Sequence, residues 1–133
     1  MDPPVHNSSV TVLVVDDDRC TRALLGILLE KDGYHIINAE DGLEALDAFE
    51  RYFPDIIITD INMPRLNGLD LIRSVRSSGG TNATTPIIAL TADTEDMVGE
   101  AQRAGANIVG RKPTDVRRVP LFIQELFETR RAH

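Results

Sequence analysis

The stretch IIITDINMP, residues 56–64, decides the fold, because an acid directly follows a run of apolar and β-branched residues. Such a short run predicts a buried strand. Asp60 ends the run, so its carboxylate either caps the segment that follows or is a working group. The same pattern occurs at TVLVV, residues 11–15, which precedes Asp16 and Asp17. Two predicted strands of this chain therefore end in carboxylates.

Short strands and amphipathic helices alternate along the chain. Apolar or β-branched runs predict strands at 11–15, 34–38, 54–59, 86–90 and 107–110. Helical periodicity predicts helices at 18–31, 43–52, 69–75 and 94–104, and a last one that contains 121–131. This alternation favours a parallel sheet covered by helices on both faces. We expect an α/β domain of five strand–helix units.

Apolar stripes predict the buried face of three helices. The stripes consist of Ala23, Leu24, Ile27 and Leu28, then Leu43, Leu46 and Phe49, and last Phe122, Ile123, Leu126 and Phe127. Leu121 points away from the last stripe and is expected to be exposed. Pro120 suits only the first turn of a helix, so the last regular helix is expected to begin near Val119, after a TDVRR segment that forms a turn.

Length and composition fit one globular domain. The 133 residues are 42% hydrophobic and 26% charged, which allows a sizeable core. No apolar run approaches the ~20 residues of a membrane helix and no signal peptide is recognisable, so we expect a cytoplasmic protein. A net charge of -7 without a basic run disfavours nucleic acid as a partner. Residues 1–10 are expected to be a flexible tail or linker, and 11–130 the domain.

Polar side chains stand where the predicted strands end. They are Asp16 and Asp17 after the first strand, Asp60 after the third, Thr91 after the fourth and Lys112 after the fifth. Ligand chemistry in open parallel sheets collects at these carboxyl ends. Mg²⁺ prefers carboxylate, water and phosphate oxygens, and a carboxylate can accept a phosphoryl group when cations neutralise the incoming oxygens. The pattern indicates a Mg²⁺ site beside a phosphoryl-accepting carboxylate.

Each of these positions also has a simpler interpretation. Asp18 is most simply the N-cap of the first helix, with the acid pair before it lying in a loop. A lone Asp60 would cap a turn, and a lone Thr91 or Lys112 would be an ordinary strand or surface residue. Their joint placement at one sheet edge favours function. The single Cys20 predicts no internal disulfide and, like the three histidines, no ligand role.

Five motifs in this order resemble the receiver domain of two-component response regulators: VLVVDDD, IIITDINMPRLNG, PIIALTA, AGA and KP. The likeness extends from about Thr11 to Phe127. It implies a flavodoxin-like (βα)5 fold, a doubly wound five-stranded parallel sheet of order 2-1-3-4-5. It also implies a signalling domain that assists its own aspartyl phosphorylation and dephosphorylation, not an enzyme.

The resemblance implies roles at the predicted sheet edge. Asp60 stands in the position of the phospho-accepting aspartate. Asp17 matches the direct Mg²⁺ ligand, Asp16 the acid that acts through water, and Asn62 the residue whose backbone carbonyl binds the metal, for which Mn²⁺ can substitute. Asn62 and Asp93 would flank the phosphoryl group and tune its hydrolysis, which predicts a short-lived phosphorylated state.

Further positions match or depart from the family's switch. Thr91 matches the switch hydroxyl, and Lys112 the lysine that pairs with the carboxylate and then with the phosphoryl oxygens. The bond from Lys112 to Pro113 is typically cis in the family. Val109 stands where many receivers have an aromatic residue, so the usual coupling of that ring to the threonine is not expected. Thr114 replaces a frequent phenylalanine.

The implied partners are proteins. The phosphoryl donor would be a phosphohistidine of a sensor histidine kinase or of a histidine phosphotransfer protein. A downstream protein would bind the face made by the fourth helix, fifth strand and fifth helix. PIIALTA resembles receivers attached to hybrid sensor kinases, which favours a phosphorelay. Few residues follow the last predicted helix, so we expect no DNA-binding or enzymatic output domain in this chain, which is either a stand-alone receiver or a receiver cut from a longer protein.

Two other functions stay open at this point. The stretch from Asp16 to Thr21 distantly resembles the DxDxT signature of haloacid-dehalogenase-type phosphatases, with Asp16 as nucleophile, although Cys20 replaces the threonine. The other alternative is a receiver fold that binds partners without using phosphate. The complete set of acids, hydroxyl and lysine favours the phospho-accepting receiver over both.

Overall fold

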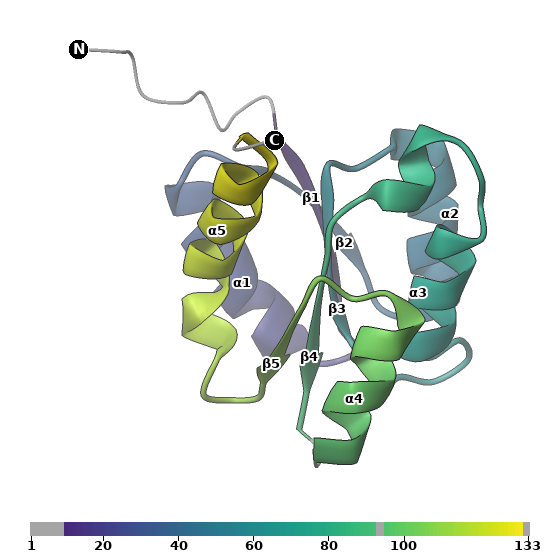
Figure 1. Cartoon of the computed structure of the whole chain (residues 1–133). Helices are drawn as coiled ribbons and strands as arrows, with labels where there is room; N and C mark the ends of the chain where they lie inside the picture. The colour runs from purple at the N-terminus through teal and green to yellow at the C-terminus, as the bar shows by residue number, and fades with distance from the viewer. Residues whose placement is uncertain (1–9, 93–94, 132–133) are drawn as a thin grey trace.

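Five parallel strands form one sheet in the order β2-β1-β3-β4-β5. The computed structural model describes residues 10–92 and 95–131. Its strands are β1 (Thr11–Val15), β2 (His35–Ala39), β3 (Ile56–Asp60), β4 (Ile87–Thr91) and β5 (Ile108–Arg111). Its α-helices are α1 (Arg19–Lys31), α2 (Gly42–Tyr52), α3 (Gly68–Arg76), α4 (Glu95–Ala104) and α5 (Val119–Arg131), with 3-10 helices η2 (Thr81–Thr84) and η3 (Val116–Arg118). The strand order confirms the predicted flavodoxin-like fold (Figure 1).

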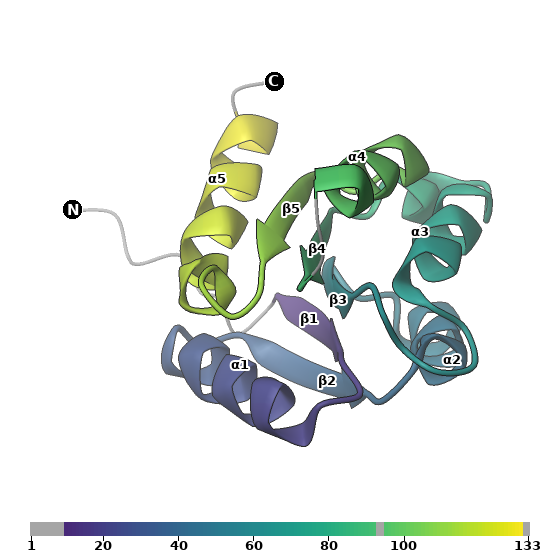
Figure 2. The same ribbon diagram turned by 90° about the horizontal axis from the view of Figure 1, so that it is seen from below.

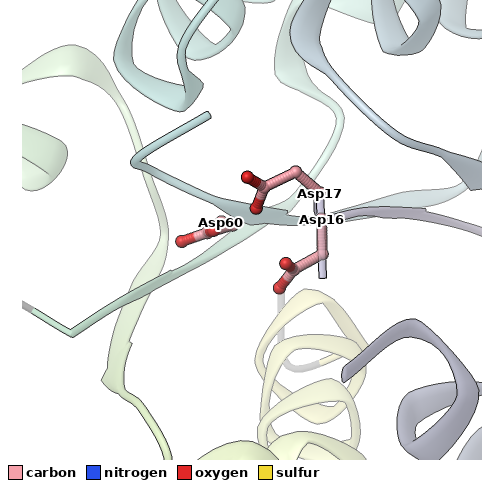
Figure 3. Close-up of side chains that lie close together, drawn as sticks. All are labelled: Asp16, Asp17 and Asp60. Carbon is pink, nitrogen blue, oxygen red and sulfur yellow. The ribbon is translucent and has the colours of Figure 1, made fainter. Parts of the chain in front are cut away.

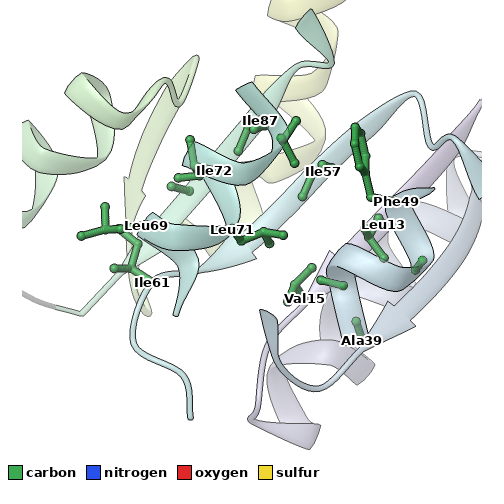
Figure 4. Close-up of a cluster of buried hydrophobic side chains, with 14 of the residues drawn as sticks. Leu13, Val15, Ala39, Phe49, Ile57, Ile61, Leu69, Leu71, Ile72 and Ile87 are labelled. Atoms are coloured by element: carbon green, nitrogen blue, oxygen red, sulfur yellow. The ribbon is translucent and has the colours of Figure 1, made fainter. Parts of the chain in front are cut away.

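Helices cover both faces of the sheet. α1 and α5 lie on one face, and α2, α3 and α4 lie on the other (Figures 1 and 2). In β1, Val12 and Val14 pack on the α1/α5 side, whereas Leu13 and Val15 pack on the opposite side. Because both faces of the central strands are buried, their sequences read as continuous apolar runs. Figure 4 shows the cluster between the sheet and α2 and α3, in which Leu13 from β1 and Phe49 from α2 take part.

The predicted stripe of α1 is right only in part, since Leu24 and Leu28 are half-buried and Leu24 packs against the core. Leu25 and Leu29 are the buried residues of this helix, whereas Ala23 is exposed and Ile27 is 66% exposed. Leu25 and Leu29 are four residues apart and so share one face of the helix. The predicted stripe is rotated from this face, because LLGILL surrounds most of the helix and its periodicity does not single out a side.

The predicted stripe of α2 is wrong at Leu43, which is 51% exposed. The helix buries Phe49 as expected, together with Ala45 and Ala48, while Leu46 is half-buried. Small alanine side chains allow the helix to approach the sheet closely. The prediction gave leucine more weight than alanine, and helix packing reversed that order.

The last helix has the predicted start and the predicted face. α5 begins at Val119, directly after the short η3 helix formed by most of the TDVRR segment. Phe122 and Ile123 are buried, and Leu121 is 56% exposed. β2, β4 and β5 each begin one residue later than predicted, and β3 begins two residues later.

Some expectations concern residues without a description. Residues 1–9, which make up most of the predicted tail, and Asp93 lie outside the described residues. Along 10–92 and 95–131, no helix combines the length and the apolar character needed to cross a bilayer.

Arg76, at the end of α3, joins three segments on the side of the sheet opposite the carboxyl ends. Its guanidinium donates to the carbonyl of Gly105 over 2.8 and 3.0 Å and to those of Ala83 and Thr85 over 2.8 and 2.6 Å. It also donates to Oδ1 of Asn107 over 2.9 Å. One side chain thus satisfies four acceptors from η2 and from the loops that precede β4 and β5.

Arg76→Met is expected to lower the free energy of unfolding by about 2 kcal/mol, because several part-buried acceptors lose their donor at once. Arg73→Met is the matched control, since Arg73 lies on the same helix and its pair with Asp70 is exposed. Urea denaturation measures both variants. Equal effects of the two substitutions would contradict the role of Arg76.

Candidate functional site

The carboxyl ends of the strands bring the predicted functional residues to one edge of the sheet. Asp60 and Thr91 are the last residues of β3 and β4, Asp16 directly follows β1, and Lys112 directly follows β5. The strand order reverses between β1 and β3, where open α/β sheets bind their ligands. Asp16 and Asp60 flank this reversal.

Three carboxylates gather at this point. One oxygen from each of Asp16, Asp17 and Asp60 lies within 4.8 Å of the other two. Figure 3 shows Asp16 and Asp17 projecting in different directions from the end of β1, with Asp60 beside them at the end of β3. Asp16 and Asp60 are buried, with 1% and 6% of their surface exposed, and Asp17 is exposed.

Several elements fix Asp16. The Asp18 N–H donates to Oδ1 of Asp16 over 2.8 Å, and Lys112 Nζ donates to Oδ2 over 2.8 Å. Arg22 of α1 donates to the Asp16 carbonyl over 2.6 Å. The Asp16 N–H donates to the carbonyl of Ala39 over 3.1 Å. Both the backbone and the carboxylate of Asp16 are therefore held in place by the fold.

The charged form of Asp60 is disfavoured by its surroundings. Burial raises the pKa of Asp60 to about 6, and the nearby charge of Asp16 adds to the rise. Lys112 Nζ, 3.5 Å from Oδ2, and the Ile61 N–H, which donates to Oδ1 over 2.8 Å, oppose the rise without cancelling it. A further positive charge near Asp60 would favour its carboxylate form.

Lys112 is a mostly buried cation between two acids, with 16% of its side chain exposed. Burial alone would lower the pKa of Lys112, but the hydrogen bond to Asp16 and the charges of Asp60 and Asp16 outweigh it and raise the pKa. The ammonium is therefore charged at neutral pH. The peptide bond between Lys112 and Pro113 is cis.

The residues present fit a divalent cation. When all groups are ionised, the three carboxylates and the Lys112 ammonium leave two negative charges at this edge. Carboxylate oxygens are hard ligands of the kind that Mg²⁺ prefers. Asn62 lies two residues beyond Asp60, in the exposed part of the loop between β3 and α3. The donor chemistry and the charge of the cluster both suit Mg²⁺.

The predicted switch residue Thr91 is fully buried at the end of β4. It comes one residue after the register partner of Asp60, so the two residues end neighbouring strands. The Thr91 carbonyl accepts a hydrogen bond from the Lys112 N–H over 2.8 Å. Val109 is half-buried against the apolar cluster on the α2, α3 and α4 side of the sheet. Asp93, the other predicted neighbour of the phosphoryl group, lies outside the described residues.

The loop after Asp60 returns close to β3 because Gly68 has no side chain. The Gly68 N–H donates to the Ile61 carbonyl over 2.8 Å. A Cβ at Gly68 would lie 2.2 Å from the Asp60 carbonyl oxygen and 2.7 Å from Ile61 Cα. The side chain of Asn67, the preceding residue, caps α3 by accepting a hydrogen bond from the Asp70 N–H over 2.9 Å.

Gly68→Ala is expected to lower the free energy of unfolding by about 2 kcal/mol, because the new methyl group meets backbone atoms that cannot rotate away. Gly26→Ala is the control, since among the described residues its added Cβ meets no atom within 4 Å beyond its chain neighbours and its own helix backbone, and alanine favours a helix interior by about 1 kcal/mol. Urea denaturation compares the two variants. If the Gly68→Ala protein were as stable as the wild type, the loop would be able to shift and accommodate the methyl group without a loss of stability.

Asp18 is the N-cap of α1, as its simplest interpretation predicts. The Cys20 N–H donates to Oδ1 of Asp18 over 3.2 Å, and the Thr21 hydroxyl donates to Oδ2 over 2.7 Å. These hydrogen bonds, that of Thr21 first, lower the pKa of Asp18. Asp18 thus begins the helix and Asp16 binds Lys112, which explains the DxDxT-like stretch without a phosphatase motif.

The contacts of two arginines were not predicted from the sequence. Arg22 binds the Asp16 carbonyl, and Arg65 in the β3–α3 loop binds Asp41 at the start of α2. Asp41 and Arg65 are 24 residues apart. The contact between Asp41 and Arg65 has no local sequence signal, because its partners lie on separate loops that meet only in the folded chain.

Comparison with known proteins places the chain in a family. The family model of the response regulator receiver domain matches residues 12–124. "Response regulator MprA" of Mycobacterium tuberculosis is 46% identical over 92 residues, which cover 69% of this chain and 38% of that protein. The protein of the same name from Mycobacterium sp. strain KMS is 45% identical over 91 residues, 68% of this chain and 37% of its own length. The chain thus spans little more than a third of these relatives.

Solved structures agree over almost the whole fold. The chemotaxis response regulator CheY4 of Vibrio cholerae has a TM-score of 0.79 and 31% identity, covering 87% of this chain and 97% of its own. The receiver domain of Francisella response regulator 1452 has a TM-score of 0.82 and 29% identity, covering 90% and 98%. The strand order, the acids at the ends of β1 and β3, and the match over residues 12–124 lead to one conclusion: the chain belongs to the response regulator receiver domain family.

Proposed function

We propose that this chain is the phospho-accepting receiver of a two-component system or phosphorelay, with Asp60 as the acceptor. One observation carries the proposal: the buried Asp60 carboxylate lies beside two further acids and 3.5 Å from Lys112 Nζ. Burying acids this close together costs free energy, which is typical of functional sites. Residues 11–130 would form the receiver domain and 1–10 a tail or linker, in a cytoplasmic protein.

The donor would be a phosphohistidine of a sensor histidine kinase or of a histidine phosphotransfer protein. A carboxylate oxygen of Asp60 attacks the phosphorus in line, so a P–O bond forms. The P–N bond to the imidazole breaks, and the imidazole nitrogen keeps the electron pair and takes up a proton. The Ile61 N–H, 2.8 Å from Oδ1, orients the carboxylate during this step. The receiver thereby assists its own phosphorylation.

Positive charge would balance the negative charge on the oxygens of the transferred phosphoryl group. Mg²⁺, or Mn²⁺ in its place, would be held by Asp16, Asp17, Asp60 and the backbone carbonyl of Asn62. Such an ion supplies electrostatic stabilisation to phosphoryl oxygens. Lys112 Nζ, within 3.5 Å of both Asp16 and Asp60, needs only a small movement to donate to an oxygen on phosphorus.

Thr91 would couple phosphorylation of Asp60 to a change in conformation. An aspartyl-phosphate brings charge and acceptor oxygens, to which the Thr91 hydroxyl donates as the loop after β4 moves with it. A downstream protein would respond at the face of α4, β5 and α5, where Val109 stands at the position of the aromatic residue that many receivers have. Asn62 and Asp93 would tune the lifetime of the phosphoryl group, which we expect to be short.

Intact-mass analysis after incubation with acetyl phosphate tests the proposal. The expected result is a gain of one phosphoryl group that requires Mg²⁺, disappears with a chelator and is removed by neutral hydroxylamine, which cleaves acyl phosphates. Peptide mapping after borohydride reduction should locate the group on Asp60. No gain with Mg²⁺ or Mn²⁺ would support the receiver that binds partners without phosphate.

A further inference from the structure

The turn between β2 and α2 supplies none of the three site carboxylates, yet it contacts α1, which follows Asp16 and Asp17, and the β3–α3 loop, which follows Asp60. Arg22 of α1 donates to the Asp16 carbonyl, and its Nη2 lies 3.6 Å from Oε1 of Glu40 in this turn. Arg65 of the β3–α3 loop donates from Nε to Oδ2 of Asp41 over 2.8 Å, and from Nη2 to the same oxygen. Two adjacent acids of the turn therefore each bind an arginine from a different side of the site.

Asp41 is a fixed anchor for Arg65. Its side chain is 7% exposed, and its Oδ1 accepts a hydrogen bond from the Glu44 N–H over 2.9 Å, which caps α2. The bond from Glu44 first, and Arg65 as well, lower the pKa of Asp41. One oxygen of Asp41 thus holds the helix and the other holds the loop.

The backbone of the β3–α3 loop also contacts the turn between β2 and α2. Arg65 has a φ of 68°, the left-handed region that a residue with a side chain rarely adopts. One residue later, the Leu66 carbonyl accepts a hydrogen bond from the Gly42 N–H over 3.0 Å, and a Cβ on Gly42 would lie 2.1 Å from that oxygen. Asn62, the expected source of a metal-binding carbonyl, is three residues before Arg65.

We propose that the Asp41–Arg65 pair positions the β3–α3 loop and thereby sets the affinity of the site for Mg²⁺ and the rate at which Asp60 accepts phosphate. This role rests on the proposed function, because it acts through the Asn62 carbonyl and the Asp60 carboxylate. Asp41 and Arg65 are positioning residues, since neither carboxylate nor guanidinium belongs to the three-acid cluster. Substitution of a residue that orients a metal ligand without touching the metal commonly lowers the affinity for the metal by about tenfold or more.

The sign of the effect separates positioning from charge. Through-space charge alone predicts that Arg65→Gln tightens cation binding, because a positive charge near the site is lost, and that Asp41→Asn weakens it. Positioning predicts that both substitutions weaken binding. Asparagine at position 41 retains an oxygen for the Glu44 N–H, so the cap of α2 is preserved.

Titration with Mg²⁺ alone, followed by amide chemical shifts, tests this prediction. We expect Arg65→Gln and Asp41→Asn each to raise the Kd for Mg²⁺ about tenfold, with the double variant no worse than either single one. Arg65→Lys, which keeps the charge, should recover part of the affinity. The matched control is the exposed pair of α2, Asp47→Asn and Arg51→Gln, which should stay within about twofold of the wild type.

Amide hydrogen exchange in cation-free protein gives a readout that does not depend on the proposed function. The Gly42 N–H, bonded to Leu66, should exchange about tenfold faster in Arg65→Gln, while the Gly68 N–H, bonded to Ile61, should change little. Wild-type protein that binds no Mg²⁺ would overturn the proposed function. Normal binding by the wild type with unchanged or tighter binding by Arg65→Gln would overturn the positioning role alone.

Discussion

Asparagine in place of Asp60 is expected to abolish phosphorylation completely and, in cation-free buffer at pH 8, to raise the free energy of unfolding by about 2 kcal/mol. Asparagine has the size of aspartate and can still accept a hydrogen bond from the Ile61 N–H, but it has no nucleophilic carboxylate. A rise in pKa from 3.8 to about 6 corresponds to about 3 kcal/mol against the charged form. The pKa of about 6 already includes the attraction to Lys112, which opposes the effects of burial and of Asp16.

The gain in stability depends on pH, and its sign follows from the pKa of Asp60. Because the folded-state pKa of about 6 lies above the ordinary value of 3.8, the folded protein takes up the proton before the unfolded chain does as the pH falls. The charged Asp60 therefore weakens the wild type above about pH 6, and this penalty fades as the pH falls toward 4. Urea denaturation with a chelator should show a large difference between Asp60→Asn and wild type at pH 8 and a small one at pH 4.5.

Two controls make this result specific. Asp47→Asn removes an exposed acid on α2 and should change neither stability nor phosphorylation. Added Mg²⁺ should stabilise the wild type more than Asp60→Asn, because the variant lacks one of the three ligand carboxylates. A stability difference that is the same at both pH values would show that the charge of Asp60 is not its cause.

The sequence was sufficient for the fold because its strands are buried on both faces. A short apolar run such as Ile56 to Ile58, with turn residues on either side, is interpreted as a buried strand and not as a helix or a half-exposed strand. Helix faces were less well determined. The exposed Ile27 and Leu43 were placed inside, because apolar residues surround α1 and because packing of α2 on the sheet favours Ala45 and Ala48 over a leucine.

The site was predictable where chain order and sheet geometry determine it together. Asp16, Asp60 and Lys112 stand directly at strand ends, so a parallel sheet must bring them to one edge, and the structure does so. Contacts between loops were not predictable. The bond between Asp41 and Arg65 depends on the left-handed backbone at Arg65 and on the close approach that Gly42 permits, neither of which has a periodic pattern.

Methionine in place of Lys112 is expected to slow phosphorylation about 100-fold while tightening Mg²⁺ binding about fivefold. The slower reaction follows because no ammonium remains to donate to the phosphoryl oxygens as their charge develops. The tighter binding follows because Lys112 Nζ, 2.8 Å from Asp16 and 3.5 Å from Asp60, competes with a cation for the same carboxylates. Methionine keeps the length and apolar contacts of the buried lysine stem.

The opposite signs of these effects distinguish a residue that contacts the reacting group from one that only shapes the metal site. The rate should be measured at saturating Mg²⁺, where the cation also stabilises a variant that leaves Asp16 without its lysine. Lys31→Met is the matched control, because Lys31 is the only other lysine of the chain and is exposed at the end of α1. If Lys112→Met weakened Mg²⁺ binding in proportion to the loss of rate, Lys112 would act through the geometry of the acids. A slower reaction together with tighter Mg²⁺ binding requires a direct contact between the ammonium and the phosphoryl group.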